Sequence, residues 1–151
     1  MPIKLENFGQ AIENDIKILG EIFDVNISTD YKEFLMKTNG GRNAGYKYLN
    51  QIEISEISEV INIDVMFGIH TNVKNADIEQ WTRDYEDDIF PNSLIIGDTM
   101  QHGFIFYWLS GDENEGIYYY DDTYEFESSS DESNAYYLAK SFSDFEAMVQ
   151  N

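Results

Sequence analysis

Two histidines and numerous carboxylates are the side chains of this sequence that could do chemistry. His70 and His102 occur without any cysteine and without the His-Glu-x-x-His spacing that places two zinc ligands on one helix face. His102 follows Asp98 in a short connection, so an enzyme that uses His102 with a carboxylate is one interpretation. A lone histidine in a turn more often lies on the surface or makes a structural hydrogen bond. We therefore predict no metal site and no catalytic residue.

Two glycine-containing segments resemble ligand loops but are incomplete. Gly40 and Gly45 have the glycine spacing of a phosphate-binding loop, but Tyr46 stands where the lysine is required. The segment 112–116 is acidic like a calcium loop, yet its glycine comes one position early and Thr123 replaces the bidentate glutamate. The sequence thus predicts no cofactor, and only a weak calcium contact stays open.

The acidic residues gather in the second half of the chain. Residues 84–139 contain 14 Asp and Glu and no Lys or Arg, whereas residues 1–83 contain 13 acids and 8 bases. Such a run can be no more than a solvated face, but it also complements a basic partner and would speed association with it. The candidate partner-binding residues lie at the end of a predicted helix and in a predicted hairpin loop: Asp84, Glu86, Asp87, Asp88, Asp112, Glu113 and Glu115.

The overall charge excludes several classes of partner. The chain has 151 residues and a net charge of −20, which repels the phosphates of nucleic acids and the surface of anionic membranes. No apolar run approaches the roughly 18 residues that span a bilayer. Glu6 and Asn7 interrupt the first stretch before a signal-peptide core could form. We expect a cytoplasmic protein with one domain over residues 1–151.

Four helices are expected from hydrophobic periodicity and end signals. The first places Phe8, Ile16 and Leu19 on one face and stops near Gly20. The others are expected after a cap at Asp30 that pairs with Glu33, with an end at Asn39-Gly40; from Asn75, with Pro91 forbidding continuation; and from Ser143, which pairs with Glu146 while Phe142 and Ala147 form a weak staple.

Strand patterns fill much of the remaining chain. Period-two alternation marks 46–67, a short apolar run covers 94–96 up to Gly97, and 104–109 is apolar throughout, as in a central strand covered on both faces. The aromatic run 117–120 should pair with 104–109 as an antiparallel hairpin, and 124–127 alternates once more. The polar segment 128–133 should be a solvated loop.

Aromatic side chains are candidates for both core and contact. Tyr118, Tyr119 and Tyr120 cannot all point inward, because successive strand residues alternate faces. At least one is a candidate contact, although cover by a second layer of helices is the ordinary explanation. Trp81 and Trp108 occupy positions of the apolar pattern, which favours core packing for both.

Three ordered stretches resemble a known family. They are Tyr31-Lys32-Glu33-Phe34-Leu35 leading to Asn39-Gly40-Gly41, then Ile95-Ile96-Gly97-Asp98-Thr99 followed by Gly103, and Ala139-Lys140-Ser141-Phe142-Ser143-Asp144-Phe145 before a terminal helix. Together they resemble the SUKH superfamily over about residues 29–149; Ile27-Ser28 departs from the Leu-Pro common in that family. The resemblance implies a single α+β domain with an antiparallel sheet of about five or six strands, flanked by helices and closed by a C-terminal helix.

The resemblance also implies a function without catalytic residues. Bacterial members are most often immunity proteins that neutralise a co-encoded toxin, frequently a nuclease, and fungal relatives regulate cell-wall assembly. Combined with the acidic half of the chain, this favours a binding protein that occludes the basic active-site surface of a toxin. A regulatory protein-interaction module in cell-wall or envelope signalling is the alternative. The sequence leaves the partner's identity, the binding face and the oligomeric state open.

Overall fold

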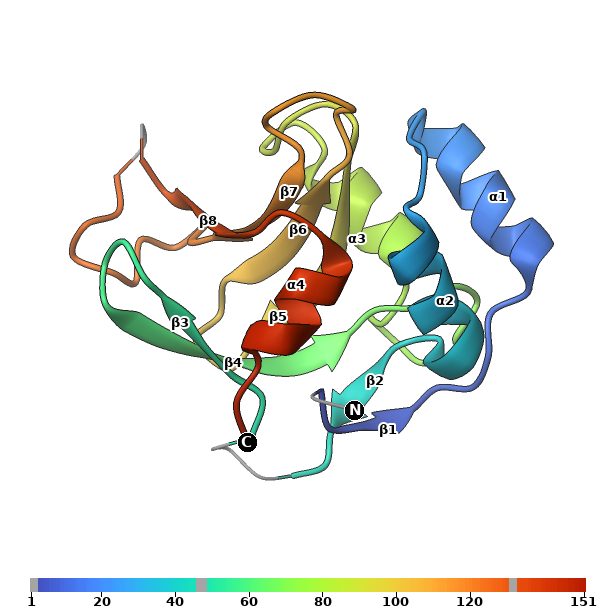
Figure 1. Cartoon of the computed structure of the whole chain (residues 1–151), viewed down its shortest axis with the longest axis horizontal. Helices are drawn as coiled ribbons and strands as arrows, with labels where there is room; N and C mark the ends of the chain where they lie inside the picture. Colours follow the sequence, from blue (N-terminus) through green and yellow to red (C-terminus); the bar gives the residue numbers. More distant parts are fainter. Residues whose placement is uncertain (1–2, 46–48, 131–132) are drawn as a thin grey trace.

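The computed structural model describes residues 3–45, 49–130 and 133–151 as an antiparallel sheet with four helices (Figure 1). The predicted α+β fold is confirmed, with more strands than expected. The elements are β1 (Leu5–Asn7), α1 (Glu13–Phe23), α2 (Thr29–Thr38), β2 (Gly41–Asn43), β3 (Gln51–Ile54), β4 (Glu59–Met66), α3 (Ile78–Tyr85), β5 (Ser93–Thr99), β6 (Phe104–Trp108), β7 (Gly116–Tyr120), β8 (Ala135–Ala139) and α4 (Phe142–Met148).

The sheet runs in the order β1-β2-β4-β5-β6-β7-β8. Strand β3 lies outside this order and pairs with β4. Every pairing between these strands is antiparallel. The expected hairpin of residues 104–109 with 117–120 is confirmed, since Ile105 pairs with Tyr119 and Tyr107 with Ile117. From β4 to β8 each strand therefore pairs with the next one in the sequence.

Helices cover the sheet on both sides. On one side Tyr31 and Phe34 of α2 contact Phe142 of α4, with ring centroids 4.8 Å apart in both pairs, and Tyr31 also contacts Tyr107 of β6. On the other side α3 packs against β5 and the neighbouring end of β6. Figure 1 shows α4 lying across the front of the central strands and α1 on the far side of the molecule from β8. The prediction that residues 104–109 form a central buried strand is confirmed, because Phe104 to Tyr107 are all buried.

The sequence pattern predicted that the first helix stops near Gly20, but the helix continues past this residue. Gly20 lies inside α1, which continues to Phe23 and ends at Asp24 in the left-handed conformation with φ 53°. A Cβ at Gly20 would lie 2.9 Å from the carbonyl oxygen of Val25. The glycine thus permits the chain to fold back closely onto the helix.

The predicted start of α2 is wrong, whereas its predicted end is confirmed. Ser28 precedes the helix as its N-cap, and Asp30 is inside it, so the expected cap of Asp30 with Glu33 is not formed. Asn39 ends the helix in the left-handed conformation, as predicted, and Gly40 follows with φ 76°. A side chain at Gly40 would collide with the backbone of Phe67, so this turn needs glycine for space as well as for conformation.

The last two helices begin at other residues than expected. Asp77, and not Asn75, precedes α3, which ends at Tyr85, well before Pro91. Ser141, and not Ser143, is the N-cap of α4, and its Oγ accepts a hydrogen bond from the backbone N–H of Asp144. Phe142 belongs to the helix and is buried, so it cannot form the predicted staple from outside it.

Four strand expectations also need correction. The segment predicted as one strand over 46–67 forms the hairpin β3–β4, and its first residues, Tyr46 among them, lie outside the described residues. Gly97 is inside β5 at an irregularity of the pairing with β6. Residues 124–127 form no strand, because the carboxylate of Asp121 accepts hydrogen bonds from the backbone N–H groups of Glu125 and Phe126 and holds a turn. Strands β1, β2 and β8 were not predicted.

Candidate functional site

A row of aromatic side chains lies on the α3 side of β6, β7 and β8. Phe90 stacks on Trp108 with ring centroids 4.1 Å apart, Trp108 contacts Tyr118 at 5.9 Å, and Tyr118 contacts Tyr137 at 5.6 Å. Tyr120 follows on the same face of β7. Phe90 and Tyr137 are 41% and 48% exposed, so the row forms part of the surface. We call Phe90, Trp108, Tyr118, Tyr120 and Tyr137 the aromatic row.

Strand alternation explains why these tyrosines are available. Tyr119 points to the opposite side and is buried, and its hydroxyl accepts a hydrogen bond from the backbone N–H of Gly103. Burial raises the pKa of Tyr119 to about 12. Tyr118 and Tyr120 stay partly exposed, because α3 reaches Phe104 and Tyr85 packs there, whereas the middle of β7 lies beyond it. Tyr119 packs against Phe126 and the β5–β6 turn, and the helical cover expected for the outward-facing tyrosines is incomplete, because Tyr118 and Tyr120 stay partly exposed.

The two tryptophans are both partly buried but have different neighbours. Trp81 stacks on Phe67 with ring centroids 4.7 Å apart, and its indole Nε1 donates a hydrogen bond to the carbonyl oxygen of Asn75. Trp108 packs against the core but belongs to the aromatic row. Core packing was predicted for both, and each is partly buried against the core.

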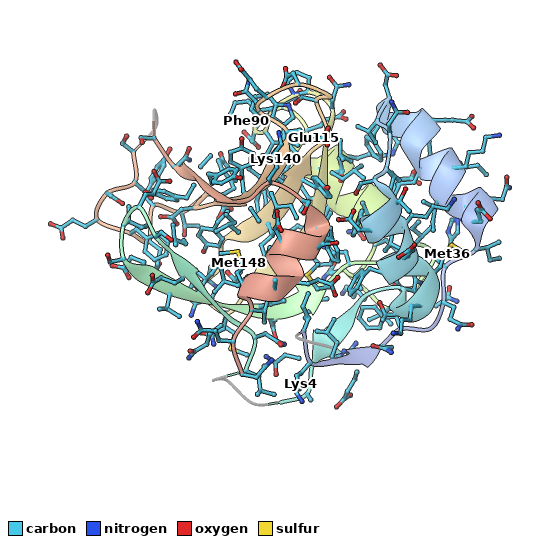
Figure 2. The ribbon with its side chains drawn as sticks, in the orientation of Figure 1. Lys4, Met36, Phe90, Glu115, Lys140 and Met148 are labelled. Carbon is cyan, nitrogen blue, oxygen red and sulfur yellow. The ribbon has the colours of Figure 1, made fainter. Side chains whose placement is uncertain are left out.

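One end of the aromatic row meets the predicted hairpin loop. The hydroxyl of Tyr118 donates a hydrogen bond to the carbonyl oxygen of Asn114, at 2.6 Å. Figure 2 places Phe90, Glu115 and Lys140 at this end of the molecule. The backbone N–H of Leu109 bonds to the carbonyl oxygen of Asn92, which holds the α3–β5 and β6–β7 loops side by side (Figure 1).

Two of the three loop carboxylates shape the loop itself. Asp112 accepts hydrogen bonds from the hydroxyl of Ser110 at 2.6 Å and from the backbone N–H of Asn114 at 2.9 Å. The hydrogen bond from Ser110 is the main cause of a lowered pKa of Asp112. Glu115 accepts from the backbone N–H of Gly111. Hydrogen bonds within the loop thus hold both carboxylates in place.

Lys140 brings a positive charge to the same loop. Its Nζ donates to the carbonyl oxygens of Asp112 and Glu113, both at 3.3 Å. It is the single Lys or Arg of the chain after Arg83. It follows the base-free segment directly and partly offsets the charge of the hairpin loop.

The predicted acids around the end of α3 lie near Tyr120 of the aromatic row. Asp84 lies in the last turn of α3, Glu86, Asp87 and Asp88 follow it, and all four are exposed. Burial raises the pKa of Tyr120, and the nearby charge of Asp88 raises it further. Asp88 therefore lies close to Tyr120, while Asp112 lies close to Tyr118. The structure thus brings both predicted acidic segments close to one aromatic row.

Asp122 joins the Asp88 end and was not predicted. Burial raises its pKa, the charges of Asp121 and Asp88 raise it further, and His102 lowers it. His102 is exposed in the β5–β6 turn with φ 74°. The carboxylate that His102 meets is thus that of Asp122. Adjacent Asp121 is buried and bonded to the turn that follows it.

A second pair of carboxylates lies on the central strands. Burial raises the pKa of Asp98 to about 7, and the charge of Asp64 adds to this effect. Asp98 Oδ1 accepts a hydrogen bond from the backbone N–H of Val65, at 3.1 Å. Asp98 stands inside an apolar strand pattern, and that position is the signal in the sequence that could have marked it.

Within residues 3–45, 49–130 and 133–151, no three His, Asp or Glu side chains come together in a way that could hold a metal ion. None of the helices in these ranges is both long and apolar enough to span a bilayer. The loop expected at 128–133 is described except for Asp131 and Glu132, and its Ser128 and Ser129 hydroxyls bond to the hydroxyl of Tyr136.

The model of the SMI1 / KNR4 family (SUKH-1) matches residues 10–148, most of the chain. No curated protein matches the sequence.

Proposed function

Because the chain belongs to the SMI1 / KNR4 family (SUKH-1), we propose that it is a protein-binding domain that neutralises a basic toxin, of nuclease type, encoded beside it. The aromatic row and the acids beside it, Asp88 and Asp112 among them, would cover the toxin's phosphate-binding Lys and Arg side chains. Carboxylates would then occupy positions that nucleic-acid phosphates take in the free enzyme. The encounter would take place in the cytoplasm, before the toxin reaches its substrate.

The observation that supports this proposal most is the combination of the aromatic row with flanking carboxylates. Tight protein interfaces depend on a few desolvated anchors, among which Trp and Tyr are enriched, while charges at the rim set the association rate. Tyr118 and Trp108 offer such anchors, and Asp88 and Asp112 lie close to Tyr120 and Tyr118 of the row. A solvated acidic face with no partner would not need exposed aromatic rings between its charges.

The test is to mix the purified protein with the polypeptide encoded beside it. We expect a stoichiometric complex, loss of the polypeptide's nuclease activity at equimolar ratio, and association that slows as salt rises. A basic protein of similar charge from an unrelated source serves as the control and should not form a stoichiometric complex. Absence of a complex at low salt would contradict the proposal.

A regulatory module for cell-wall or envelope signalling would use the same surface on another basic client. The neighbouring genes separate the two possibilities. A neighbour with a secretion region and a nuclease-like end agrees with toxin neutralisation. An envelope operon whose product binds the aromatic row would favour regulation instead.

A further inference from the structure

The outer side of α1 is apolar where a surface helix is normally polar. Ile18 and Ile22 lie one turn apart on it and are 45% and 41% exposed. The helix already buries Ile16 and Leu19 in the core. Ile18 and Ile22 therefore belong to a second apolar face, which the fold of the described chain does not need for its core.

A hollow lies beside these isoleucines. Ile18, Leu19 and Ile22 line a cavity of about 80 Å³ together with Gly68 and Ile69, which follow β4. This is room for the branched end of one aliphatic side chain. We call the cavity and its rim the α1 groove. Figure 1 shows α1 on the opposite side of the molecule from β8, which carries one end of the aromatic row.

The lining of the α1 groove is negative. Asp15, Asp77, Glu79 and His70 are its remaining side chains, and it includes no Lys or Arg. Asp77 accepts two hydrogen bonds from Thr71, and Glu79 pairs with Arg83 at 3.0 Å. Asp15 lies in the first turn of α1, and its carboxylate makes no hydrogen bond or ion pair within the described part of the chain. Its charge is available to a cation from outside.

Charge decides between possible occupants. A second copy of a chain with net charge −20 would bring more negative charge to an acidic rim, which opposes self-association. A cationic segment would instead gain from Asp15 while an aliphatic side chain fills the cavity.

We propose that the α1 groove is a second docking surface, which binds a short basic segment of a protein partner through one inserted aliphatic side chain. This surface is separate from the aromatic row and does not depend on the toxin proposal. Together with the aromatic row, the α1 groove would give the domain two separate surfaces that bind basic protein partners.

The experiment uses a twelve-residue amphipathic peptide of Lys and Leu as the probe, added to the full chain labelled with ¹⁵N. The same peptide with Glu in place of Lys is the control probe. We expect amide shifts at Ile18, Ile22 and Ile69 with the basic peptide, weaker at high salt, and none with the acidic peptide. Ile18→Ser should weaken binding at least tenfold.

Ile12→Ser is the matched control variant, because Ile12 precedes α1, is 66% exposed and does not line the groove. It should bind within twofold of the unchanged protein. Asp15→Asn tests the charge without altering an apolar contact and should weaken binding severalfold. Equal binding of the acidic peptide, equal loss in Ile12→Ser, or shifts confined to Tyr118 and Tyr137 would overturn the proposal. So would a dimer in sedimentation experiments that Ile18→Ser abolishes.

Discussion

The carboxylate of Asp30 in α2 accepts two hydrogen bonds from Ser143 in α4, one from the backbone N–H at 2.8 Å and one from the hydroxyl at 3.0 Å. The two residues are 113 positions apart. Asp30→Ala should lower the free energy of unfolding by about 1–2 kcal/mol, because the first turn of α4 loses its acceptor. Urea unfolding measures this, with Glu33→Ala, an exposed change in the same helix, as the control. Equal effects of the two changes would show that the bridge contributes nothing.

The contribution of Asp30 should disappear in acid. Burial raises its pKa, but hydrogen bonds from Ser28, Ser143 and Tyr31 more than offset this, and the pKa is lowered. A carboxyl group with a lowered pKa stabilises the fold above its unfolded pKa, and this stability is lost as pH falls through the folded value. The stability difference between the protein and Asp30→Asn should therefore shrink below about pH 4.

Asp98 should have the opposite pH dependence. Its pKa is raised to about 7, mainly by burial, from an ordinary value of about 4. The folded state holds this proton more tightly, so stability should fall as pH rises from about 4 to about 7. Asp98→Asn keeps an acceptor for the N–H of Val65 and should be about 1–2 kcal/mol more stable than the unchanged protein at pH 8. The two proteins should be nearly equal at pH 4; an equal gap at both pH values would refute this assignment.

Gly103 should tolerate no side chain. A Cβ there would collide with the phenol of Tyr119 and the carbonyl oxygen of Tyr120. Gly103→Ala should cost about 3 kcal/mol of stability, because both obstacles belong to the packed β7 strand. Gly111→Ala is the comparison: it has open space around it but φ 74°, and should cost only about 1 kcal/mol. Thermal or urea unfolding distinguishes steric from conformational cost, and similar losses would contradict the packing argument.

Tyrosines and carboxylates should affect different rate constants of the proposed complex. Tyr118→Ser and Tyr137→Ser remove anchors and should raise the dissociation rate at least tenfold. Asp87→Asn with Asp88→Asn should mainly slow association and reduce its salt dependence. Met36→Ser, an exposed apolar change on α2 (Figure 2), should alter neither. Stopped-flow and surface-binding kinetics separate the two effects; unchanged rates in all variants would place the interface elsewhere.

Lys140 gives a test of opposite sign at the hairpin loop. Lys140→Gln removes the one positive charge beside Asp112 and Glu113, so a basic partner should associate faster, by about two- to fivefold at low salt. Asp112→Asn should slow association. If both changes slow it, the loop's shape matters more than its charge, and faster amide exchange over residues 111–115 would be the accompanying signature.

The fold was predictable where local signals agree with packing. The left-handed end at Asn39 and the fully apolar strand at Phe104–Trp108 were expected correctly, because each follows from a local steric or burial rule. The start of α2 was missed because a tertiary contact engages the expected capping side chain: Asp30 binds Ser143. Strand β8 carries two adjacent tyrosines beside a polar loop, and its pairing with β7 depends on contacts between distant parts of the sequence.

The site was predictable in charge but not in shape. The sequence marked both acidic segments, yet it could not show that Asp88 and Asp112 lie beside one aromatic row. Phe90 follows an acidic turn and Tyr137 belongs to an unpredicted strand, so no pattern joined them to Tyr118. Asp122 was not predicted, and its approach to Asp88 depends on how α3 ends.

The neighbour-to-neighbour pairing from β4 to β8 bears on how the molecule assembles itself. Within it, the hairpins β5–β6 and β6–β7 need only short chain closures, which keeps their entropic barrier low. The central strands β5, β6 and β7 should gain protection from amide exchange early in refolding. Strand β1 and helices α1 and α2 should pack against the sheet afterwards. Newly synthesised chains would then expose the tyrosines of β7 before α1 and α2 are packed in place.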